Sequence, residues 1–416
     1  MKKYFVILIL VSFAAVSCGE TEDLGAPSPL PDNFEYPTGE PDDDEEEEEE
    51  EEETQGVNMW AIDMTPLEID GKYYAVWSGW DKYYENREGT GQYLYIAEMT
   101  FHDQAPKVRL GERVLLSSPE KSWELAQGEN FSLLEGPEIL KHDNDVFIIY
   151  STRGSWTVHY KMGQLRLTDR SAPLNPASWT KKETPVFTGV TSADGLGYEV
   201  YGAGHASFTT SPDDMEYWIN YHSKTLPEGG WDDRKVFFKK FVFDANGDPD
   251  FGIAPDMSVP QTRPSGETAI DSSFGIAGGS PTFLNPVREG ADPWIVKHDG
   301  KYYTCRSIQR GIWVTESPYM TKFVDDAGTE ITWEQARKKV WTPPALTSDK
   351  WNVAQHWAPE LHYINGNWYI FYAAGRQQSA PYWQHRAGVL ISTSGSPFGP
   401  YEEHDTQPLF TGEKES

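Results

Sequence analysis

Several features are scarce in this 416-residue chain, and each scarcity argues against a class of protein. Two cysteines cannot build a disulfide-rich scaffold or a cysteine-rich zinc site. The 35 lysines and arginines stand against 65 aspartates and glutamates, which argues against nucleic-acid binding by a basic surface. No apolar run reaches the roughly 18 residues that span a bilayer. Long amphipathic helices are missing too, and only residues 328–340 predict a short helix. Aromatic residues, in contrast, make up 14% of the chain.

The first 17 residues have the pattern of a secretory signal. Lys2 and Lys3 precede the apolar run from Tyr4 to Val16, which is too short for a membrane span. The sequence Ala-Val-Ser-Cys that ends at Cys18 resembles the lipobox of bacterial lipoproteins. The resemblance implies cleavage before Cys18, lipidation of its sulfur, and lipid anchoring in the bacterial cell envelope, at the outer membrane, with the leaflet and surface exposure left open. The alternative is an ordinary secretory signal with an incidental cysteine.

Residues 18–56 predict a disordered tether. This stretch is rich in proline and then in acid, with twelve consecutive carboxylates from Asp42 to Glu53. Such a block repels itself and has no apolar surface to bury. We therefore expect a spacer between the lipid anchor, the only predicted membrane contact, and a folded domain over residues 57–416. That domain has 33 basic and 47 acidic residues, a formal charge of −14.

One pattern recurs five times within residues 57–416. Each copy is a short polar turn followed by alternating aromatic and β-branched residues, which is typical of a β-hairpin. The copies cover residues 69–77, 142–150, 213–221, 298–306 and 364–372. Their turn residues are Gly71, Asn144, Met215, Gly300 and Gly366, spaced by 73, 71, 85 and 66 residues.

This spacing predicts an all-β fold, a five-bladed β-propeller. About 70 residues per copy suit a four-stranded blade with long loops, and five blades close into a ring around a central channel. A β-sandwich is the alternative, because alternation alone would fit it as well. The regular period favours the propeller.

Ionisable residues occur at a similar place in each repeat. Asp63, Glu135, His205 and Asp292 lie eight to ten residues before the turns of the first four copies. In a propeller such positions are related by rotation about the channel, so we expect the side chains to converge. Crowded carboxylates repel one another and their pKa values separate. One can then act as an acid and another as a base, which is what glycoside hydrolysis requires.

Aromatic residues near these positions suit a sugar site, because the CH faces of sugar rings stack on aromatic rings. The candidates by position are Trp60, Trp123, Trp156, Trp294 and Trp357. Each ionisable residue alone has a structural alternative: an aspartate before proline fits a turn, His205 fits a buried structural role, and Glu360 is expected to cap a loop. The shared offset in different repeats favours the functional interpretation for the three carboxylates.

The motifs resemble glycoside hydrolase family 43 along all of residues 57–416. Ala-Asp-Pro-Trp-Ile-Val resembles the family's opening blade and implies that Asp292 is the general base. Ala-Ile-Asp-Met-Thr-Pro-Leu resembles the segment whose aspartate orients the acid and tunes its pKa, which places Asp63. Glu-Gly-Pro-Glu-Ile-Leu resembles the general-acid segment and places Glu135.

The resemblance also implies binding residues. Gly-Ala-Gly-His-Ala-Ser-Phe is similar to the family's Gly-Pro-Gly-His segment, which implies that His205 lies near the channel axis, beside a calcium ion or a water cluster. Arg234 falls where a substrate-contacting arginine would lie. His356 and Trp357 are assigned to substrate binding. No organic cofactor is required, and calcium is the only metal that the resemblance suggests.

The order of the motifs departs from the family. The usual order is base, orienting aspartate, acid, whereas this chain runs Asp63, Glu135, Asp292. A circular permutation explains the order, because rotation preserves every neighbour in a ring. A broken tandem of two copies is the alternative, but five repeats in about 360 residues favour one permuted ring. How residues 57–60 and 405–412 pair stays open.

We expect an inverting exo-glycosidase. Residues 175–179 and 357–362 resemble the α-L-arabinofuranosidase branch, which implies terminal arabinofuranose on a plant cell-wall polysaccharide or oligosaccharide as substrate. A β-xylosidase, an endo-arabinanase and a galactan-directed enzyme remain open. Two alternatives come from other classes. The intact carboxylates argue against a non-catalytic surface glycan-binding lipoprotein, and missing Gly-His and Trp-Asp marks argue against a protein-interaction propeller.

Overall fold

The structure is a computed structural model that describes residues 57–83, 91–125, 132–267, 281–380 and 382–412. The chain divides into two units, Met1–Glu52 and Glu53–Ser416, and all described residues belong to the second. The expected signal peptide (1–17), Cys18 and the tether (18–56) therefore lie outside the described residues. Within the described ranges, no helix is long and apolar enough to cross a membrane.

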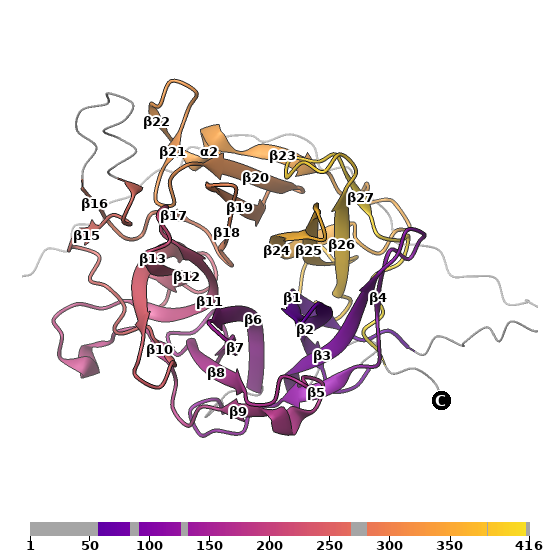
Figure 1. Ribbon diagram of the computed structural model, residues 1–416, viewed down its shortest axis with the longest axis horizontal. Coiled ribbons are helices and arrows are strands. Elements are labelled where there is room, and N and C mark those ends of the chain that lie inside the picture. Colours follow the sequence, from indigo (N-terminus) through magenta and orange to yellow (C-terminus); the bar gives the residue numbers. More distant parts are fainter. Residues whose placement is uncertain (1–56, 84–90, 126–131, 268–280, 381, 413–416) are drawn as a thin grey trace, which may run out of the picture. The chain divides into compact units, whose positions relative to one another are not determined.

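Five antiparallel blades, one per sequence repeat, follow one another along the chain, and a short parallel pairing of β3 with β6 joins the first two into one sheet (Figure 1). Blade 1 contains β1 (Ala61–Ile69), β2 (Lys72–Trp80), β3 (Gly91–Phe101), β4 (Val108–Leu110) and β5 (Val114–Ser117). Blade 2 contains β6 (Ser132–His142), β7 (Asp145–Thr152), β8 (Lys161–Leu167), β9 (Trp179–Lys181) and β10 (Phe187–Thr188). Blade 3 contains β11 (Tyr201–Thr210), β12 (Tyr217–Lys224), β13 (Arg234–Phe243) and β14 (Pro249–Asp250), with β17 (Arg288–Glu289) beside β13.

The last two blades have the same plan. Blade 4 contains β18 (Trp294–His298), β19 (Lys301–Ser307), β20 (Ile312–Ser317) and β23 (Lys338–Trp341), and blade 5 contains β24 (Ala354–Ile364), β25 (Asn367–Gly375), β26 (Arg386–Ser392) and β27 (Tyr401–Glu403). Small elements lie in the connections. Within blades 2 and 4 these are η1 (Pro176–Ser178), the strand pair β21 (Phe323–Val324) with β22 (Glu330–Ile331), and α2 (Trp333–Ala336); between blades they are η2 (Ser192–Asp194) and the strand pair β15 (Gln261–Thr262) with β16 (Thr282–Phe283). The short helix expected over residues 328–340 is thus one turn, flanked by strands.

The predicted hairpins join the first two strands of every blade. Each turn contains a short polar residue in the left-handed region, with φ between 48° and 59°. These residues are Asp70, Asp143, Asp214, Asp299 and Asn365. Aspartate and asparagine tolerate this conformation better than most residues, which is why the repeat is visible in the sequence. The five-bladed β-propeller is confirmed, and the β-sandwich alternative is wrong.

An apolar core fills each junction between neighbouring blades. Separate clusters of buried side chains join blades 1 and 2, 2 and 3, 3 and 4, and 4 and 5, and a fifth joins blade 5 back to blade 1. The inner strands also neighbour one another in the cycle β1, β6, β11, β18, β24 and β1 again. The abundant aromatic residues are therefore mostly inter-blade packing, with Trp77, Phe147, Phe237 and Phe371 among the fully buried ones.

The ring closes between the two ends of the described chain. Asn58 Nδ2 donates a hydrogen bond to the Leu409 carbonyl at 2.9 Å. The side-chain oxygen of Asn58 accepts bonds from the backbone N–H and the hydroxyl of Thr411, at 2.9 and 3.1 Å. Leu409 is itself buried in the core shared by blades 5 and 1. The pairing of the chain ends, which the sequence left open, thus depends on one asparagine.

We expect Asn58→Ala to lower the free energy of unfolding by about 1–3 kcal/mol, because the change leaves the partners of Asn58 without their bonds. Chemical denaturation would measure the loss. Asn144→Ala is the matched control, because Asn144 is exposed in a hairpin turn. Equal stability of the two variants would contradict the assigned role of Asn58.

Candidate active site

An irregular residue occurs at the same place in every inner strand. The residues Asp63, Gly136, His205, Asp292 and Ala358 all have φ between 39° and 53°. In four blades the pairing register shifts across this residue, and in blade 4 it lies two residues before the start of β18. A bulge of this kind re-aims side chains at the rim of a sheet. In blade 2 the bulge residue is Gly136. Glu135, which the sequence repeats align with Asp63 and Asp292, therefore lies one residue before the bulge position.

Asp292 has the most crowded carboxylate of the cluster. Its Oδ1 lies 3.3 Å from His205 Nδ1, 3.4 Å from His222 Nδ1 and 3.3 Å from Arg234 Nη1, which donates a hydrogen bond to it. Burial acts to raise the pKa of Asp292, but His205, Arg234 and His222 lower it well below the ordinary value of 3.8. Asp292 is therefore ionised at neutral pH and can accept a proton.

The pKa of Glu135 is shifted in the opposite direction to that of Asp292. Burial, with a contribution from the negative charge of Asp292, raises the pKa of Glu135 to about 7. The phenol of Tyr160 and the amide of Gln92 act in the other direction by stabilising the carboxylate, and Gln92 Nε2 donates to Glu135 Oε2 at 3.3 Å. A carboxyl group with this pKa holds its proton in much of the physiological range and can donate it.

Asp63 connects these groups through the backbone. Its Oδ2 accepts a hydrogen bond of 3.0 Å from the N–H of Gly136, the residue after Glu135. Burial and the charges of Glu135 and Asp292 raise the pKa of Asp63 well above its ordinary value. The structure thus brings Asp63, Glu135 and Asp292 into one electrostatically coupled cluster, together with His205 and Arg234. Their chemical roles remain predictions.

His205 is buried at the bulge of blade 3, and its N–H donates to Ser151 Oγ at 2.8 Å. Within the described part of the chain, no group of three or more His, Cys, Asp or Glu residues is arranged to hold a metal ion. The described residues around His205 therefore offer the expected calcium no protein cage. No chemical step is assigned to such an ion.

The sequence comparison missed His222. Its side chain is fully buried, its Nδ1 accepts a bond from the Asp292 N–H at 3.2 Å, and its ring stacks on Tyr160 at 5.4 Å. Burial lowers the pKa of His222 to about 3, so the ring is neutral. His222 lies on β12, the second strand of its blade, where inner-strand offsets cannot find it. The only available signal is the alternation of Asn220, His222 and Lys224 along an otherwise apolar strand.

Two groups of the predicted tryptophans lie near the cluster. Trp60 stacks on Trp80 with 4.8 Å between centroids, and both share an apolar cluster with Trp357 and with Ile62, the neighbour of Asp63. Trp156, which is 41% exposed, meets Trp231 edge-on at 5.6 Å.

Trp231 in turn adjoins the charged cluster, because its carbonyl accepts a bond from Arg234 Nε at 3.0 Å. The sequence comparison did not identify Trp231, which lies in a loop outside the repeat.

Other predicted binding residues lie in packing positions instead. Trp123 packs on the core between blades 1 and 2, and its Nε1 donates to the Glu183 carbonyl. Trp294 belongs to the core between blades 4 and 5, with Nε1 bonded to the Leu361 carbonyl. His356 is buried, with Nε2 2.9 Å from the Asn352 carbonyl. These contacts show a packing role for the three side chains, and their assignment to substrate binding stays a prediction.

A second polar layer lies two residues beyond the bulges. Glu138 on β6 and Glu360 on β24 are both buried, and His362 Nε2 lies 2.9 Å from Glu360 Oε2. Burial raises the pKa of both carboxyl groups well above the ordinary value. The expectation that Glu360 caps a loop is wrong, because Glu360 lies within a strand.

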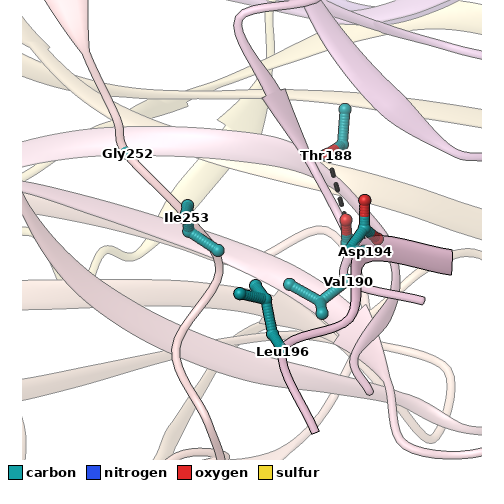
Figure 2. A pocket seen from close by; sticks show the side chains of 7 residues that line it. Thr188, Val190, Asp194, Leu196, Gly252 and Ile253 are labelled. Atoms are coloured by element: carbon teal, nitrogen blue, oxygen red, sulfur yellow. Dashed lines mark hydrogen bonds between the residues drawn. The ribbon is translucent and has the colours of Figure 1, made fainter. Parts of the chain in front are cut away.

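A surface pocket lies elsewhere, beside β10 and the segment after β14 (Figure 2). Its lining residues are Thr188, Gly189, Val190, Asp194, Leu196, Gly252 and Ile253. Apolar side chains dominate the part drawn in Figure 2, and no member of the charged cluster lines the pocket. The charged cluster, rather than this pocket, is therefore the candidate active site.

Comparison with known proteins gives a consistent family. The family profile described as glycosyl hydrolases family 43 matches residues 49–249 and 283–415. The α-L-arabinofuranosidase B of Pyricularia oryzae is 30% identical over 213 residues, which cover 50% of this chain and 41% of that protein. An extracellular exo-α-(1→5)-L-arabinofuranosidase of Streptomyces avermitilis is 29% identical over 212 residues, or 50% and 40%. The chain thus spans about two fifths of the length of these relatives.

Solved structures also match. The α-L-arabinofuranosidase of Lactobacillus brevis is 29% identical with a TM-score of 0.40, covering 47% of this chain and 57% of that one. The Cellvibrio cellulosa α-L-arabinanase complexed with arabinohexaose is 13% identical with a TM-score of 0.49, covering 83% and 96%.

We expect Gly136→Ala to disturb the cluster. A Cβ at Gly136 would lie 3.0 Å from His205 Nδ1, the atom that faces Asp292. Gly300→Ala is the matched control, because Gly300 also has a positive φ but nothing within 4 Å of its Cβ position. Both variants should lose about 1–3 kcal/mol to backbone strain. Gly136→Ala should lose more stability than the control. Equal losses would contradict this prediction, because they would mean that the His205 side chain moves away from the new Cβ without cost.

Proposed function

The chain belongs to glycosyl hydrolase family 43, and we propose that it is an inverting exo-glycosidase that removes terminal α-L-arabinofuranosyl residues from plant cell-wall polysaccharides. One observation carries the proposal: two carboxyl groups of one cluster have pKa values displaced in opposite directions. Glu135 is displaced upward and Asp292 downward. Glycoside hydrolysis with inversion needs this division between a protonated acid and an ionised base.

The proposed reaction is a single displacement. Glu135 gives its proton to the glycosidic oxygen, while Asp292 takes a proton from a water molecule that attacks the anomeric carbon from the opposite face. Inversion implies that the two carboxyl groups are about 6.5–9.5 Å apart, with the water between them. Asp63 holds the backbone N–H of Gly136 and so orients the neighbouring Glu135. Together with His205, Arg234 keeps Asp292 ionised, and we propose that it also contacts the sugar.

The choice of sugar is supported by the relatives. Two curated relatives are described as α-L-arabinofuranosidases, one of them an exo-acting α-(1→5) enzyme. β-Xylosides, arabinan backbones and galactan remain alternative substrates, because loops at the mouth of a propeller set specificity. A permuted order of blades remains our interpretation of the sequence Asp63, Glu135, Asp292.

We also propose that Cys18 carries lipid and anchors the protein in the bacterial cell envelope. The support is the lipobox-like sequence before Cys18, followed by the acidic tether. A non-catalytic surface glycan-binding lipoprotein is the alternative function. It would bind polysaccharide without releasing sugar from aryl arabinofuranosides, aryl xylosides, arabinan, xylan or arabinogalactan.

Glu135→Gln and Asp292→Asn should each reduce turnover by about 10²–10⁴-fold, the typical contribution of general acid–base catalysis. Sugar release from arabinan and from an aryl arabinofuranoside would measure the loss, and circular dichroism would check the fold. Glu98→Gln is the matched control, because Glu98 is an exposed glutamate on β3. Wild-type turnover in both site variants would reject the assigned roles.

The pH profile of kcat/KM should be asymmetric. Activity requires protonated Glu135, so it should fall as pH rises through about 7. It also requires ionised Asp292, so it should persist until the pH is below the ordinary aspartate pKa of 3.8. Gln92→Leu removes a donor to the Glu135 carboxylate and should move the alkaline limb upward while leaving the acid limb in place. An alkaline limb that stays or moves down would contradict the assignment of Glu135.

A further inference from the structure

A row of side chains crosses the outer strands of blade 4. Arg306 on β19 pairs with Trp313 on β20, and Trp313 pairs with Lys339 on β23. Directly paired residues project from the same face of a sheet. Arg306 and Trp313 are half-buried and Lys339 is exposed, so the row reaches solvent at its outer end. Two more arginines and a tryptophan pack on this row, and we call the whole set the cationic strip: Arg288, Arg306, Trp313, Trp333, Arg337 and Lys339.

The indole rings of the strip are surrounded by positive charge. The Arg337 guanidinium lies 4.6 Å from the ring centroid of Trp313 and 5.1 Å from that of Trp333. Arg306 and Arg288 lie 5.3 and 5.8 Å from the Trp333 ring. Cation–π contacts of this kind contribute about 0.5–2 kcal/mol each, but they leave the N–H donors of the guanidinium groups available.

Acidic residues act on two of the four cations: the charge of Glu334 acts on Arg288 and Arg306, and the charges of Asp292 and Glu289 act on Arg306. In the part of the chain that the structure describes, no ion pair joins Arg288, Arg306, Arg337 or Lys339 to an acid, although nearby Lys235 and Lys301 pair with Glu289 and Glu316. Arg288 also has a buried Nη1 without a hydrogen-bond partner.

Like charges at close range destabilise one another. Burial and the charge of Arg306 lower the pKa of Arg288 to about 9, which is consistent with this cost. A bound anion would offset it.

The inner end of the strip lies beside the proposed general base. Gly290 is two residues before Asp292, and a Cβ there would lie 2.9 Å from Arg306 Cζ. The missing side chain lets the guanidinium lie against the backbone, and Arg306 Nη1 donates to the Glu289 carbonyl at 2.9 Å. An extended ligand in the active site could therefore continue along blade 4.

We infer that the cationic strip binds the carboxylate of a uronic acid residue in the polysaccharide substrate. Guanidinium groups match the geometry of a carboxylate and bind it with charge-assisted hydrogen bonds. The inference goes beyond the proposed function. It rests on that function only in assuming that the substrate is a plant cell-wall polysaccharide. The selected substrate would be an acidic polysaccharide rather than a neutral one.

The test measures binding without turnover. Full-length Glu135→Gln protein is titrated with glucuronoarabinoxylan and with the same polysaccharide after chemical reduction of its carboxyl groups. Reduction should weaken binding about tenfold, the scale of one to two charge-assisted hydrogen bonds. Arg337→Ala and Lys339→Ala, added to this protein, should each remove most of the difference. Added salt should diminish it as well.

Lys338→Ala is the matched control. Lys338 neighbours Lys339 on the same strand, but its amine lies over the Phe398 ring on the other face. This variant should retain the preference for the acidic polysaccharide. A loss equal to that of Lys339→Ala would indicate an effect of net charge and overturn the inference.

Two further outcomes would also overturn it. One is equal binding of the native and reduced polysaccharides. The other is equal competition by free glucuronate and by inorganic phosphate, which would indicate a general anion site. Failure of the proposed function can be told apart from failure of this inference. If the wild-type protein released no sugar but still preferred the acidic polysaccharide, the glycosidase function would be rejected and the role of the cationic strip would stand.

Discussion

The charged cluster depends on a backbone conformation that four non-glycine residues adopt against their intrinsic preference. Asp63, His205, Asp292 and Ala358 lie in the left-handed region, where each costs about 1–3 kcal/mol. The surrounding blades impose this conformation, because the apolar junctions fix every inner strand on both sides. The backbone strain is thus confined to single residues, whereas the apolar packing that compensates for it is distributed around the ring. Without these bulges, the alternation of the strands would direct the same residues elsewhere.

His205 and Arg234 break the electrostatic symmetry of the cluster, because both favour the ionised form of Asp292. Asp63, Glu135 and Asp292 all lose solvation on burial, and burial alone would raise all three pKa values. Arg234 contacts Asp292 directly, and the neighbouring imidazoles favour the same carboxylate. One carboxyl group is therefore ionised, and its charge helps to keep the others protonated. The chemistry follows from the neighbours that blade 3 supplies, more than from the carboxyl groups themselves.

Much of this arrangement could be predicted from the sequence, and the same physical reasons explain why some site residues could not be predicted. The repeats were visible because hairpin turns require Asp, Asn or Gly, and Asp63 and Asp292 were found because the bulge keeps a constant distance from the turn. His222 could not be found in this way, since it reaches the cluster from a second strand. The packing role of Trp123 and Trp294 could not be found either, because a local pattern does not say which face of a blade meets its neighbour.

The closure by Asn58 has a consequence for biosynthesis. The partners Asn58 and Leu409 are separated by 351 positions, so the junction between blades 5 and 1 cannot form until nearly the whole polypeptide has emerged. Blades 2, 3 and 4 have both neighbours available earlier, whereas β1 must wait with one apolar flank uncovered. A chain that is synthesised from its N-terminus therefore passes through an open arc, and chaperones that shield apolar surface would act on its first blade.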